Sequence, residues 1–328
     1  MRAIGYSAFG SASDVLALHD LEMPEPAAGE VRVRLTYSGV NPSDAKARSG
    51  TRPGVLKPAF DLVIPHSDGA GVIDAVGAGV NPARVGQRVW IWNGQWQRAF
   101  GTAAEAICLP SEQAVLLPDG ISDEAGATLG IPGLTAAHAV FGGGDITGQT
   151  LLISGGAGAV GHNAVQLAKW GGATVIATAS PSAFERVKAA GADHVLDYRA
   201  DDLATQILSL TNGIGVDRAV EVEFGVNAPL LAEVVRANGV IAAYGSQLDM
   251  APTLPFGPFL FKAITIDIVL IYILEAAPRA VAIDKLHSAL QASALTPAIH
   301  EVLPLEDAAR AHERVMTAGR NGAVLLKI

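Results

Sequence analysis

The chain has 328 residues, half of them apolar, with a net charge of −9 and a single cysteine. This length predicts one large domain or two ordinary ones with a sizeable core. The negative charge argues against nucleic acids and anionic membrane surfaces as partners, because both attract basic patches. One cysteine excludes an intrachain disulfide framework and a four-cysteine zinc site. The sequence pattern contains no signal peptide or membrane-spanning segment, so we expect a cytoplasmic protein.

The first 129 residues read as short strands separated by turns that contain glycine. Four such strands are expected, at residues 31–38, 63–79, 88–92 and 104–109. The first of them alternates apolar and polar side chains, as a half-buried strand does. Closely spaced strands of this kind predict a compact β-rich barrel. Two helices are expected next, at residues 122–128, with Ser122 as the N-cap, and at residues 134–141.

From residue 151 onward, strands and helices alternate regularly. The expected strands cover residues 151–154, 174–178, 194–196, 217–221 and 239–243. The expected helices between them cover residues 159–170, 183–190, 203–211 and 228–235. This alternation predicts a parallel, doubly wound sheet, and the fold class is therefore α/β. Beyond it we expect a loop, a β-branched strand, two helices and a closing strand, at residues 252–258, 264–274, 278–292, 305–317 and 324–328.

A glycine-rich segment separates the first of these strands from its helix. Gly156, Gly158 and Gly161 match the spacing G-x-G-x-x-G. In that motif the glycines make the turn, admit a pyrophosphate and let the helix pack on the strand. The helix that begins at Ala159 and Val160 directs free backbone N–H groups toward the phosphates. The segment therefore predicts a dinucleotide site.

The end of the second strand bears on which dinucleotide is bound. NAD sites usually place Asp or Glu there to bind the ribose 2′-hydroxyl, and neither follows Thr178 in this sequence. Ser180, Ser182 and Arg186 could instead bind a 2′-phosphate, so we expect NADPH. The alternative is that both serines cap the next helix and that Arg186 lies on its solvated face.

Four further segments are found together with this motif, at residues 39–44 (GVNPSD), 65–72 (PHSDGAGV), 130–136 (GIPGLTA) and 197–199 (DYR). With them, nearly the whole chain resembles the zinc-free quinone oxidoreductases, the zeta-crystallin-like group of the medium-chain dehydrogenase/reductase superfamily. The resemblance implies a GroES-like catalytic domain formed by residues 1–129 and 265–328 and a Rossmann domain formed by residues 130–264. It also implies a homodimer joined through the apolar strand 264–274, unless that strand is buried in the interior.

The resemblance also implies roles for single residues. It places Asn41 and Thr135 at the nicotinamide end of the cofactor as the catalytic residues. The further cofactor contacts that it implies are Tyr198, Gly245, Ser246 and Asn321. Ordinary alternatives exist for three residues: Asn41 in a turn, Thr135 bonded to a helix carbonyl and Tyr198 as a packed aromatic.

A zinc site is not expected. Zinc-dependent relatives have a cysteine where Asn41 stands and another beyond the first helix of the Rossmann domain, and this chain has neither. His66 lies near the position of a zinc-ligand histidine, but a catalytic zinc needs three protein ligands. We therefore expect no metal, with His66 as a structural or pocket-lining residue.

The chain departs from the family pattern near the expected substrate cleft. Many relatives have tyrosines where this chain has Lys46 and Arg52. These two cations and Trp96 are the expected substrate contacts, although Trp92 or Trp96 could equally pack on the surface. A lysine that some relatives carry near Pro181 is missing, which weakens the expectation of NADPH without reversing it.

The expected activity is zinc-independent hydride transfer from NADPH to a quinone. Because the cofactor carries the hydride, the protein has to orient the acceptor and stabilise negative charge on it. Two alternatives remain open. One is an NADPH-dependent reductase of 2-alkenals or other α,β-unsaturated carbonyls, and the other is a crystallin-like protein that binds NADPH without turnover.

Overall fold

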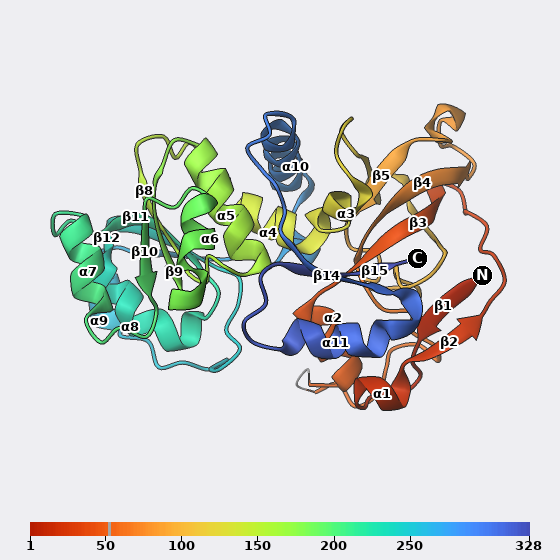
Figure 1. Cartoon of the computed structure of the whole chain (residues 1–328), viewed down its shortest axis with the longest axis horizontal. Helices are drawn as coiled ribbons and strands as arrows, with labels where there is room; N and C mark the ends of the chain where they lie inside the picture. Colours follow the sequence, from red (N-terminus) through yellow and green to blue (C-terminus); the bar gives the residue numbers. More distant parts are fainter. Residues whose placement is uncertain (52–53) are drawn as a thin grey trace. The chain divides into compact units, whose positions relative to one another are not determined.

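The computed structural model describes residues 1–51 and 54–328. Its internal contacts divide the chain into two compact units. The first unit contains Met1–Pro132 and Pro297–Ile328, and the second contains Gly133–Thr296. Both ends of the chain therefore belong to the first unit, where the labels N and C stand beside β1 and β15 in Figure 1.

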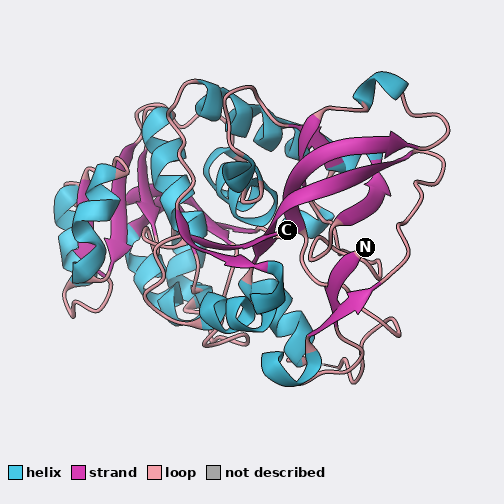
Figure 2. Ribbon diagram, turned by 45° about the vertical axis from the view of Figure 1, so that its right-hand side comes forward, coloured by secondary structure: helices cyan, strands magenta, loops and turns pink. Residues whose placement is uncertain are grey.

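The first unit is built on a mostly antiparallel sheet, whose strands are magenta in Figure 2. Among its described residues the strand order is β14-β15-β3-β4-β5-β7, and β6 also pairs with β3. These strands are β3 (Glu30–Val40), β4 (Asp68–Val76), β5 (Arg88–Ile91), β6 (Ala106–Pro110), β7 (Ala114–Leu116), β14 (Ile299–Pro304) and β15 (Ala323–Lys327). A separate ribbon pairs β1 (Arg2–Gly5) with β2 (Ala17–Asp20).

The pattern of β3 explains how this sheet packs. Val31 and Val33 alternate with Arg32 and Arg34, so that one face of the strand is apolar. The valines are buried in a cluster with side chains of β4, β5 and β6. Both arginines bind Asp74 of β4, each at an N–O distance of 2.8 Å. The β-rich N-terminal part expected from the sequence is confirmed.

Short helices complete the first unit. They are α1 (Ala12–Val15), α2 (Pro42–Ser49), α3 (Asp123–Gly126), α11 (Ala308–Met316), a π-helical turn at Leu129–Gly133 and 3₁₀ turns at Pro82–Arg84, Ser111–Gln113 and Leu305–Asp307. Ser122 caps α3 as expected, because its Oγ accepts the N–H of Ala125 at 3.2 Å. α11 packs against α1, α2 and β15, so the end of the chain completes the N-terminal core.

The second unit is a doubly wound α/β domain, as the sequence predicts. Its six strands are parallel in the order β10-β9-β8-β11-β12-β13. They are β8 (Thr150–Ile153), β9 (Thr174–Ala179), β10 (His194–Asp197), β11 (Val216–Glu221), β12 (Val235–Ala243) and β13 (Thr265–Ile268). The helices are α4 (Leu134–Phe141), α5 (Ala159–Trp170), α6 (Phe184–Ala189), α7 (Leu203–Leu210), α8 (Phe224–Val234), α9 (Phe256–Phe261) and α10 (Ala276–Gln291), with 3₁₀ turns at Pro181–Ala183 and Ile271–Ile273.

The winding of this sheet marks the place where a ligand is expected. One cluster of buried side chains joins α7, α8 and α9 to β8, β9, β11 and β12, while α5 and α6 contact β8, β9 and β10 (Figure 1). The strand order reverses between the neighbours β8 and β11. In open α/β sheets, ligands bind outside the carboxyl ends of the strands at such a reversal. Within the described residues, no helix is both long and apolar enough to cross a membrane.

The boundary between the units differs from the one expected at residue 265. β13 pairs in parallel with β12, and α10 packs against α4. Residues 265–296 therefore belong to the second unit, and only residues 297–328 return to the first. The sequence pattern does not show this, because an apolar strand followed by a helix fits either unit.

Three local elements also differ from the sequence prediction. The apolar run 264–274 is a strand only as far as Ile268, and a 3₁₀ turn follows. The helix α9 replaces part of the loop expected at residues 252–258. Pro255 precedes this helix and Pro258 lies in its first turn, where proline removes no intrahelical hydrogen bond. The strand β14 was not expected, because its sequence mixes polar residues with a proline.

Candidate functional site

The loop between β8 and α5 carries the glycine-rich segment. Gly155 makes the turn with a φ of +67°, a left-handed conformation that favours glycine. The N–H of Gly156 donates to the carbonyl oxygen of Thr178 at 2.9 Å, and the N–H of Gly158 donates to that of Gly155 at 2.9 Å. These bonds fix the loop across the carboxyl ends of β8 and β9. The sequence motif did not single out Gly155, although this glycine makes the turn.

At Gly161 the helix α5 and the loop meet backbone to backbone. A Cβ atom there would lie 2.2 Å from the carbonyl oxygen of Gly155 and 3.0 Å from the Cα of Gly156. Only glycine therefore allows the first turn of α5 to approach so closely. Ala159 and Val160 begin this helix, where no helical carbonyl precedes their N–H groups. In general, such free N–H groups and the positive end of a helix dipole attract anions.

Polar side chains follow the end of β9, beside the glycine loop. Ser180 and Ser182 lie with their Oγ atoms 3.2 Å apart, and Ser180 makes no side-chain cap bond. Arg186 Nη1 donates to the carbonyl oxygen of Ala157 in the glycine loop at 2.6 Å. The alternative of a solvated Arg186 therefore does not hold.

Two buried polar atoms beside this loop have no protein partner. They are Nη2 of Arg186 and Nδ1 of His162, which lies on the first turn of α5. Burial, and next the charge of Arg186, lowers the pKa of His162 to about 4, so this imidazole is neutral near pH 7. Buried donors and acceptors are almost always satisfied, and an anionic ligand would satisfy the guanidinium.

The neighbouring strand β11 ends in an acidic cluster that the sequence analysis missed. Glu221 is fully buried, and its Oε2 accepts the hydroxyl of Ser154 at 2.5 Å. Its Oε1 accepts the N–H of Glu223 at 2.5 Å and Nδ2 of Asn227 at 2.9 Å. Burial raises the pKa of Glu221. The signal that could have found it is a carboxylate at the end of an otherwise apolar strand.

Gly245 and Ser246 follow β12 beside this cluster. Ser246 Oγ accepts the N–H of Gly225 at 2.9 Å and donates to the carbonyl of Asp249. A Cβ atom at Gly245 would lie 2.5 Å from the carbonyl oxygen of Val222. Both residues therefore hold the loop after β12 close to the end of β11.

In the first unit, three of the segments that carry the family resemblance meet at Asp68. Asn41 Nδ2 donates to Asp68 Oδ2 at 2.8 Å, and the N–H of Ile131 donates to Oδ1 at 2.8 Å. Asn41 also begins α2, where it forms a capping box with Asp44. Burial raises the pKa of Asp68 well above its ordinary value, although the two donors lower it, and Asp44 raises it further. Asp68 lies in the segment 65–72 that carries the family resemblance, but no role was expected for this residue.

His66 is a structural residue inside the first unit. It is fully buried, and its φ of 78° is rare for a residue other than glycine. Its Nδ1 lies 2.9 Å from Ser38 Oγ and its Nε2 lies 2.9 Å from Nε2 of His312 on α11. Ser38 Oγ in turn lies 2.8 Å from Thr102 Oγ1, which donates to the carbonyl of Asp68 at 2.5 Å.

The directions of these hydrogen bonds follow from counting protons. Thr102 gives its one hydroxyl proton to Asp68, so Ser38 must donate to Thr102. Ser38 then accepts from Nδ1 of His66, and Nε2 of His66 accepts from Nε2 of His312. Burial lowers the pKa of His66 well below its ordinary value and, with the charge of Arg48, that of His312 to about 3. Both imidazoles are therefore neutral.

The residues around His66 do not fit a zinc site. Both of its ring nitrogens are engaged by Ser38 and His312. Among the residues that the structure describes, no group of three His, Cys, Asp or Glu side chains could hold a metal ion. Burial raises the pKa of the Cys108 thiol to about 11, so this cysteine is a protonated, apolar side chain at neutral pH.

The remaining residues expected at the site lie in both units. Thr135 is buried on the first turn of α4, in the second unit. Tyr198 is 54% exposed, and the guanidinium carbon of Arg199 lies 4.8 Å from its ring centre. Tyr198 is therefore not a packed interior aromatic. Asn321 lies exposed in the loop before β15.

The expected substrate residues belong to the first unit. Lys46 on α2 and Trp96 are half-buried, whereas Trp92 is buried. Arg52 lies outside the residues that the structure describes. The burial of Trp92 makes it a core residue, so that Trp96 alone of the two remains an expected contact.

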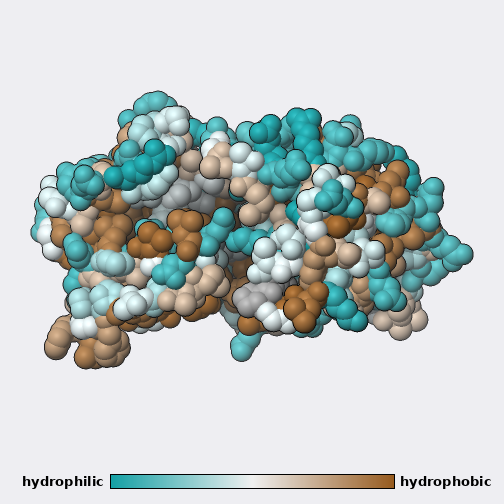
Figure 3. Space-filling view, turned by 90° about the horizontal axis from the view of Figure 1, so that it is seen from below, coloured by the Kyte–Doolittle hydropathy of each residue, from teal (hydrophilic) through white to brown (hydrophobic). Residues whose placement is uncertain are grey.

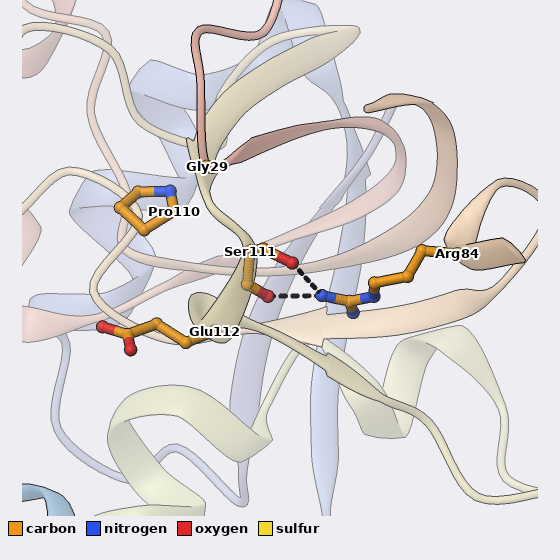
Figure 4. A pocket seen from close by; sticks show the side chains of 5 residues that line it. All are labelled: Gly29, Arg84, Pro110, Ser111 and Glu112. Atoms are coloured by element: carbon orange, nitrogen blue, oxygen red, sulfur yellow. Dashed lines mark hydrogen bonds between the residues drawn. The ribbon is translucent and has the colours of Figure 1, made fainter. Parts of the chain in front are cut away.

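A surface pocket of about 460 Å³ lies elsewhere in the first unit, beside Gly29, Arg84 and Ser111 (Figure 4). Arg84 Nη1 points at Ser111, donating to its carbonyl oxygen at 2.6 Å and to its Oγ at 2.5 Å. Its Nε donates to Gln87 Oε1 at 3.1 Å. The guanidinium is therefore already engaged by the protein, and none of the expected site residues lines this pocket.

Comparison with known proteins agrees with this geometry. Residues 27–119 match the family model described as "Alcohol dehydrogenase GroES-like domain", and residues 159–285 match the one described as "Zinc-binding dehydrogenase". Quinone oxidoreductase from Sus scrofa is 28% identical over 331 residues, which cover 99% of this chain and 97% of the relative. The human synaptic vesicle membrane protein VAT-1 homolog is 32% identical over 250 residues, 75% of this chain but only 61% of that protein's own length.

Solved structures extend the likeness to the full chain. A mycobacterial protein complexed with NADPH has a TM-score of 0.87 and 27% identity, covering all of both chains. An NAD-dependent alcohol dehydrogenase has a TM-score of 0.88 and 30% identity, again covering all of both chains. The chain belongs to the quinone oxidoreductase family of medium-chain dehydrogenases/reductases. In this family member, the fold expected from the resemblance is confirmed.

We predict that Gly161→Ala lowers the free energy of unfolding by about 1–3 kcal/mol, because the new Cβ forces α5 away from the loop. Gly158→Ala is the matched control. A Cβ at Gly158 would meet nothing closer than 3.4 Å, so we expect the control to lose less than about 1 kcal/mol. Urea unfolding of the two variants measures both values, and equal losses would contradict the close contact at Gly161.

Proposed function

We propose that this protein transfers a hydride from NADPH to a quinone without a metal ion. The observation that carries the proposal is the glycine loop at the reversal between β8 and β11, with no carboxylate at the end of β9. The likeness to a quinone oxidoreductase and to an NADPH complex along nearly the whole chain supports it. Bound NADPH supplies the hydride from C4 of its nicotinamide.

The glycine loop and the first turn of α5 would hold the pyrophosphate. Gly156 and Gly158, which have no side chains, would let the pyrophosphate approach the backbone of the loop. Gly161 allows the first turn of α5 to approach the loop, and the N–H groups of Ala159 and Val160 would donate to the pyrophosphate. The fit rests on the close packing of α5 against the loop, which leaves room for no side chain at Gly161. The exposed ring of Tyr198 at the end of β10 is proposed to contact the adenosine end.

The choice of NADPH over NADH rests on charge. The segment after β9 offers the hydroxyls of Ser180 and Ser182 and the cation of Arg186, whose Nη2 is buried without a partner. A 2′-phosphate would satisfy this donor in a charge-assisted hydrogen bond. The likeness to an NAD-dependent alcohol dehydrogenase favours the alternative of NADH, but the carboxylate that would bind a free 2′-hydroxyl is not found after Thr178.

At the nicotinamide end we propose Asn41 in the first unit and Thr135 in the second as the catalytic residues. Gly245 and Ser246, held beside the end of β11, and Asn321 are proposed to border the cofactor. Both Asn41 and Thr135 are nearly buried polar groups, which keeps water away and strengthens their hydrogen bonds. Their part is to orient the ring and exclude water, since orientation alone supplies much of a rate enhancement.

For the acceptor we propose Lys46 and Trp96 as contacts, together with Arg52. An acceptor oxygen gains negative charge as the hydride arrives, and a nearby ammonium group stabilises that charge. The indole of Trp96 offers a flat apolar surface to a quinone ring. A 2-alkenal or another enone would develop the same charge on its carbonyl oxygen. Many relatives have tyrosines where this chain has Lys46 and Arg52. Because the expected substrate contacts differ in this way, both acceptor classes have to be tested.

We predict NADPH oxidation with 1,4-naphthoquinone at a higher kcat/KM than with an enone. Lys46→Gln should lower kcat/KM for the quinone about tenfold, because a charge that stabilises the transition state is lost. Lys57→Gln, which removes an exposed lysine from the following segment, is the control and should change little. Loss of NADPH absorbance measures each rate.

Two results would contradict the quinone assignment. Turnover of the enone alone would identify an enone reductase. Binding of NADPH without oxidation by any acceptor of a broad panel would identify a non-catalytic binding protein.

We further propose a homodimer joined through β13. This strand is at the edge of the second sheet, and unpaired edges tend to pair with other chains. Ile268 on this strand is 69% exposed, and Phe261 at the end of α9, which precedes the strand in the sequence, is 89% exposed. Apolar groups, in brown, are visible among polar ones on the left-hand unit in Figure 3. Burial of such a patch would stabilise a dimer.

Ile268→Lys should convert the dimer to a monomer, because a charge would be buried in the new interface. Leu116→Lys is the matched control, since Leu116 is a 54% exposed aliphatic residue on β7, the strand at one end of the other sheet's order. The molar mass from light scattering reports the outcome. A monomeric wild-type protein, or an Ile268→Lys variant that remains dimeric, would contradict an interface at β13.

A further inference from the structure

His162, on the first turn of α5, carries a buried ring nitrogen, Nδ1, without a hydrogen-bond partner among the residues that the structure describes. The backbone of this residue is fully used by the helix. Its N–H donates to the carbonyl oxygen of Gly158 at 2.8 Å, and its own carbonyl oxygen accepts Nε2 of Gln166 at 3.2 Å. Buried polar atoms nearly always have a partner, and the contacts within the second unit supply none for Nδ1.

Arg186 is the charged neighbour of this ring. Burial, and next the positive charge of Arg186, lowers the pKa of His162 to about 4. Nη1 of Arg186 donates to the carbonyl oxygen of Ala157 at 2.6 Å, which holds the guanidinium against the glycine loop. Nη2 of the same guanidinium is also buried without a partner in the described part of the chain. Two unsatisfied nitrogens therefore lie beside the loop at which a dinucleotide is proposed to bind.

One kind of ligand atom would satisfy both nitrogens. Nη2 of a guanidinium can only donate, and a neutral imidazole donates from the ring nitrogen that carries its proton. A phosphate oxygen accepts from both, and its charge makes these hydrogen bonds stronger than those to a neutral acceptor. The side chains of His162 and Arg186 are each only partly buried, so each can turn its nitrogen toward a ligand at the surface of the loop.

We infer that His162 is a specificity-determining residue, which donates from Nδ1 to the 2′-phosphate of NADPH beside Arg186. The inference rests on the proposed function, because it takes the dinucleotide to bind at the glycine loop. It goes beyond that function by assigning to the phosphate a neutral donor on α5 in addition to the cation on α6. A neutral donor can stand beside Arg186 without the repulsion that a second cation would meet. The sequence motif does not indicate this residue, because G-x-G-x-x-G ends one position before it.

His162→Leu tests the inference because it removes the donor and keeps a side chain of similar size. We expect the dissociation constant for NADPH to rise about tenfold, since a hydrogen bond to a charged group is lost, and that for NADH to change less than about threefold. Calorimetric titration with both cofactors measures these constants. His194→Leu is the matched control, because His194 is exposed at the start of β10, at the opposite end of the sheet from Ser180. The control should leave both constants unchanged.

Stability without cofactor and a rescue variant separate a ligand contact from a structural role. Because Nδ1 has no protein partner to lose, His162→Leu should be at least as stable as the wild type in urea. His162→Asn retains an N–H donor near the position of Nδ1 and should recover severalfold of the affinity for NADPH that His162→Leu loses. A leucine variant that is less stable than the wild type, or an asparagine variant that binds NADPH no better than the leucine variant, would overturn the inference.

The proton on Nδ1 gives a readout that needs no turnover. In protein labelled with ¹⁵N-histidine, the ring signals that disappear in His162→Leu belong to His162. We expect Nδ1 to carry a proton in the complex with NADP⁺, and its signal to shift with adenosine 2′,5′-bisphosphate but not with AMP. An unprotonated Nδ1 in the NADP⁺ complex would accept from Arg186 within the protein instead, and this result would overturn the inference.

Failure of the inference and failure of the proposed function give different results. A wild type that prefers NADPH, with a preference that His162→Leu retains, would overturn the inference alone. A wild type that binds NADH more tightly would contradict the proposed cofactor and, with it, the phosphate contact. A wild type that binds NADPH but reduces no acceptor would contradict the proposed hydride transfer, while loss of the NADPH preference in His162→Leu would still support the contact.

Discussion

The contact on which the second unit depends is the approach of α5 to the loop after β8. The Cβ position of Gly161 lies 2.2 Å from the carbonyl oxygen of Gly155, so the helix start can come no closer and no larger residue fits. The loop is also bonded to Thr178 at the end of β9. One short segment therefore fixes a helix start against two strands at the reversal of the sheet, which is where a phosphate can meet the helix dipole.

The first unit buries a group of hydrogen-bonded polar side chains around Asp68. Asp68 is held by an amide and a backbone N–H, and the two neutral imidazoles of His66 and His312 are connected to its carbonyl through hydroxyl groups. Within this network, Nδ1 of His312 is buried without a hydrogen-bond partner among the described residues. The hydrogen bonds of the network join β3, β4, the loop before α2 and the C-terminal helix α11. The geometry near Asn41 is thus set by residues far from it in the sequence.

Local sequence patterns predicted the elements whose signals are local. The helices α4 and α5 begin and end where expected, because glycines and apolar periodicity mark their ends. The boundary at Thr296 was not predicted, because it depends on which sheet the strand β13 joins. The helix α9 was not predicted, because it depends on where a proline falls within a helical turn. The roles of Glu221 and Asp68 were missed for the same reason. Each depends on a partner that is distant along the chain.

The central claim is that the glycine loop and Arg186 bind NADPH in preference to NADH. Calorimetric titration of the wild type and of Arg186→Gln with both cofactors tests it most directly. We predict that the wild type binds NADPH at least about tenfold more tightly and that the substitution removes most of this preference, because a charge-assisted hydrogen bond to the 2′-phosphate is worth about 1.5–3 kcal/mol. Equal or tighter binding of NADH by the wild type would contradict the claim.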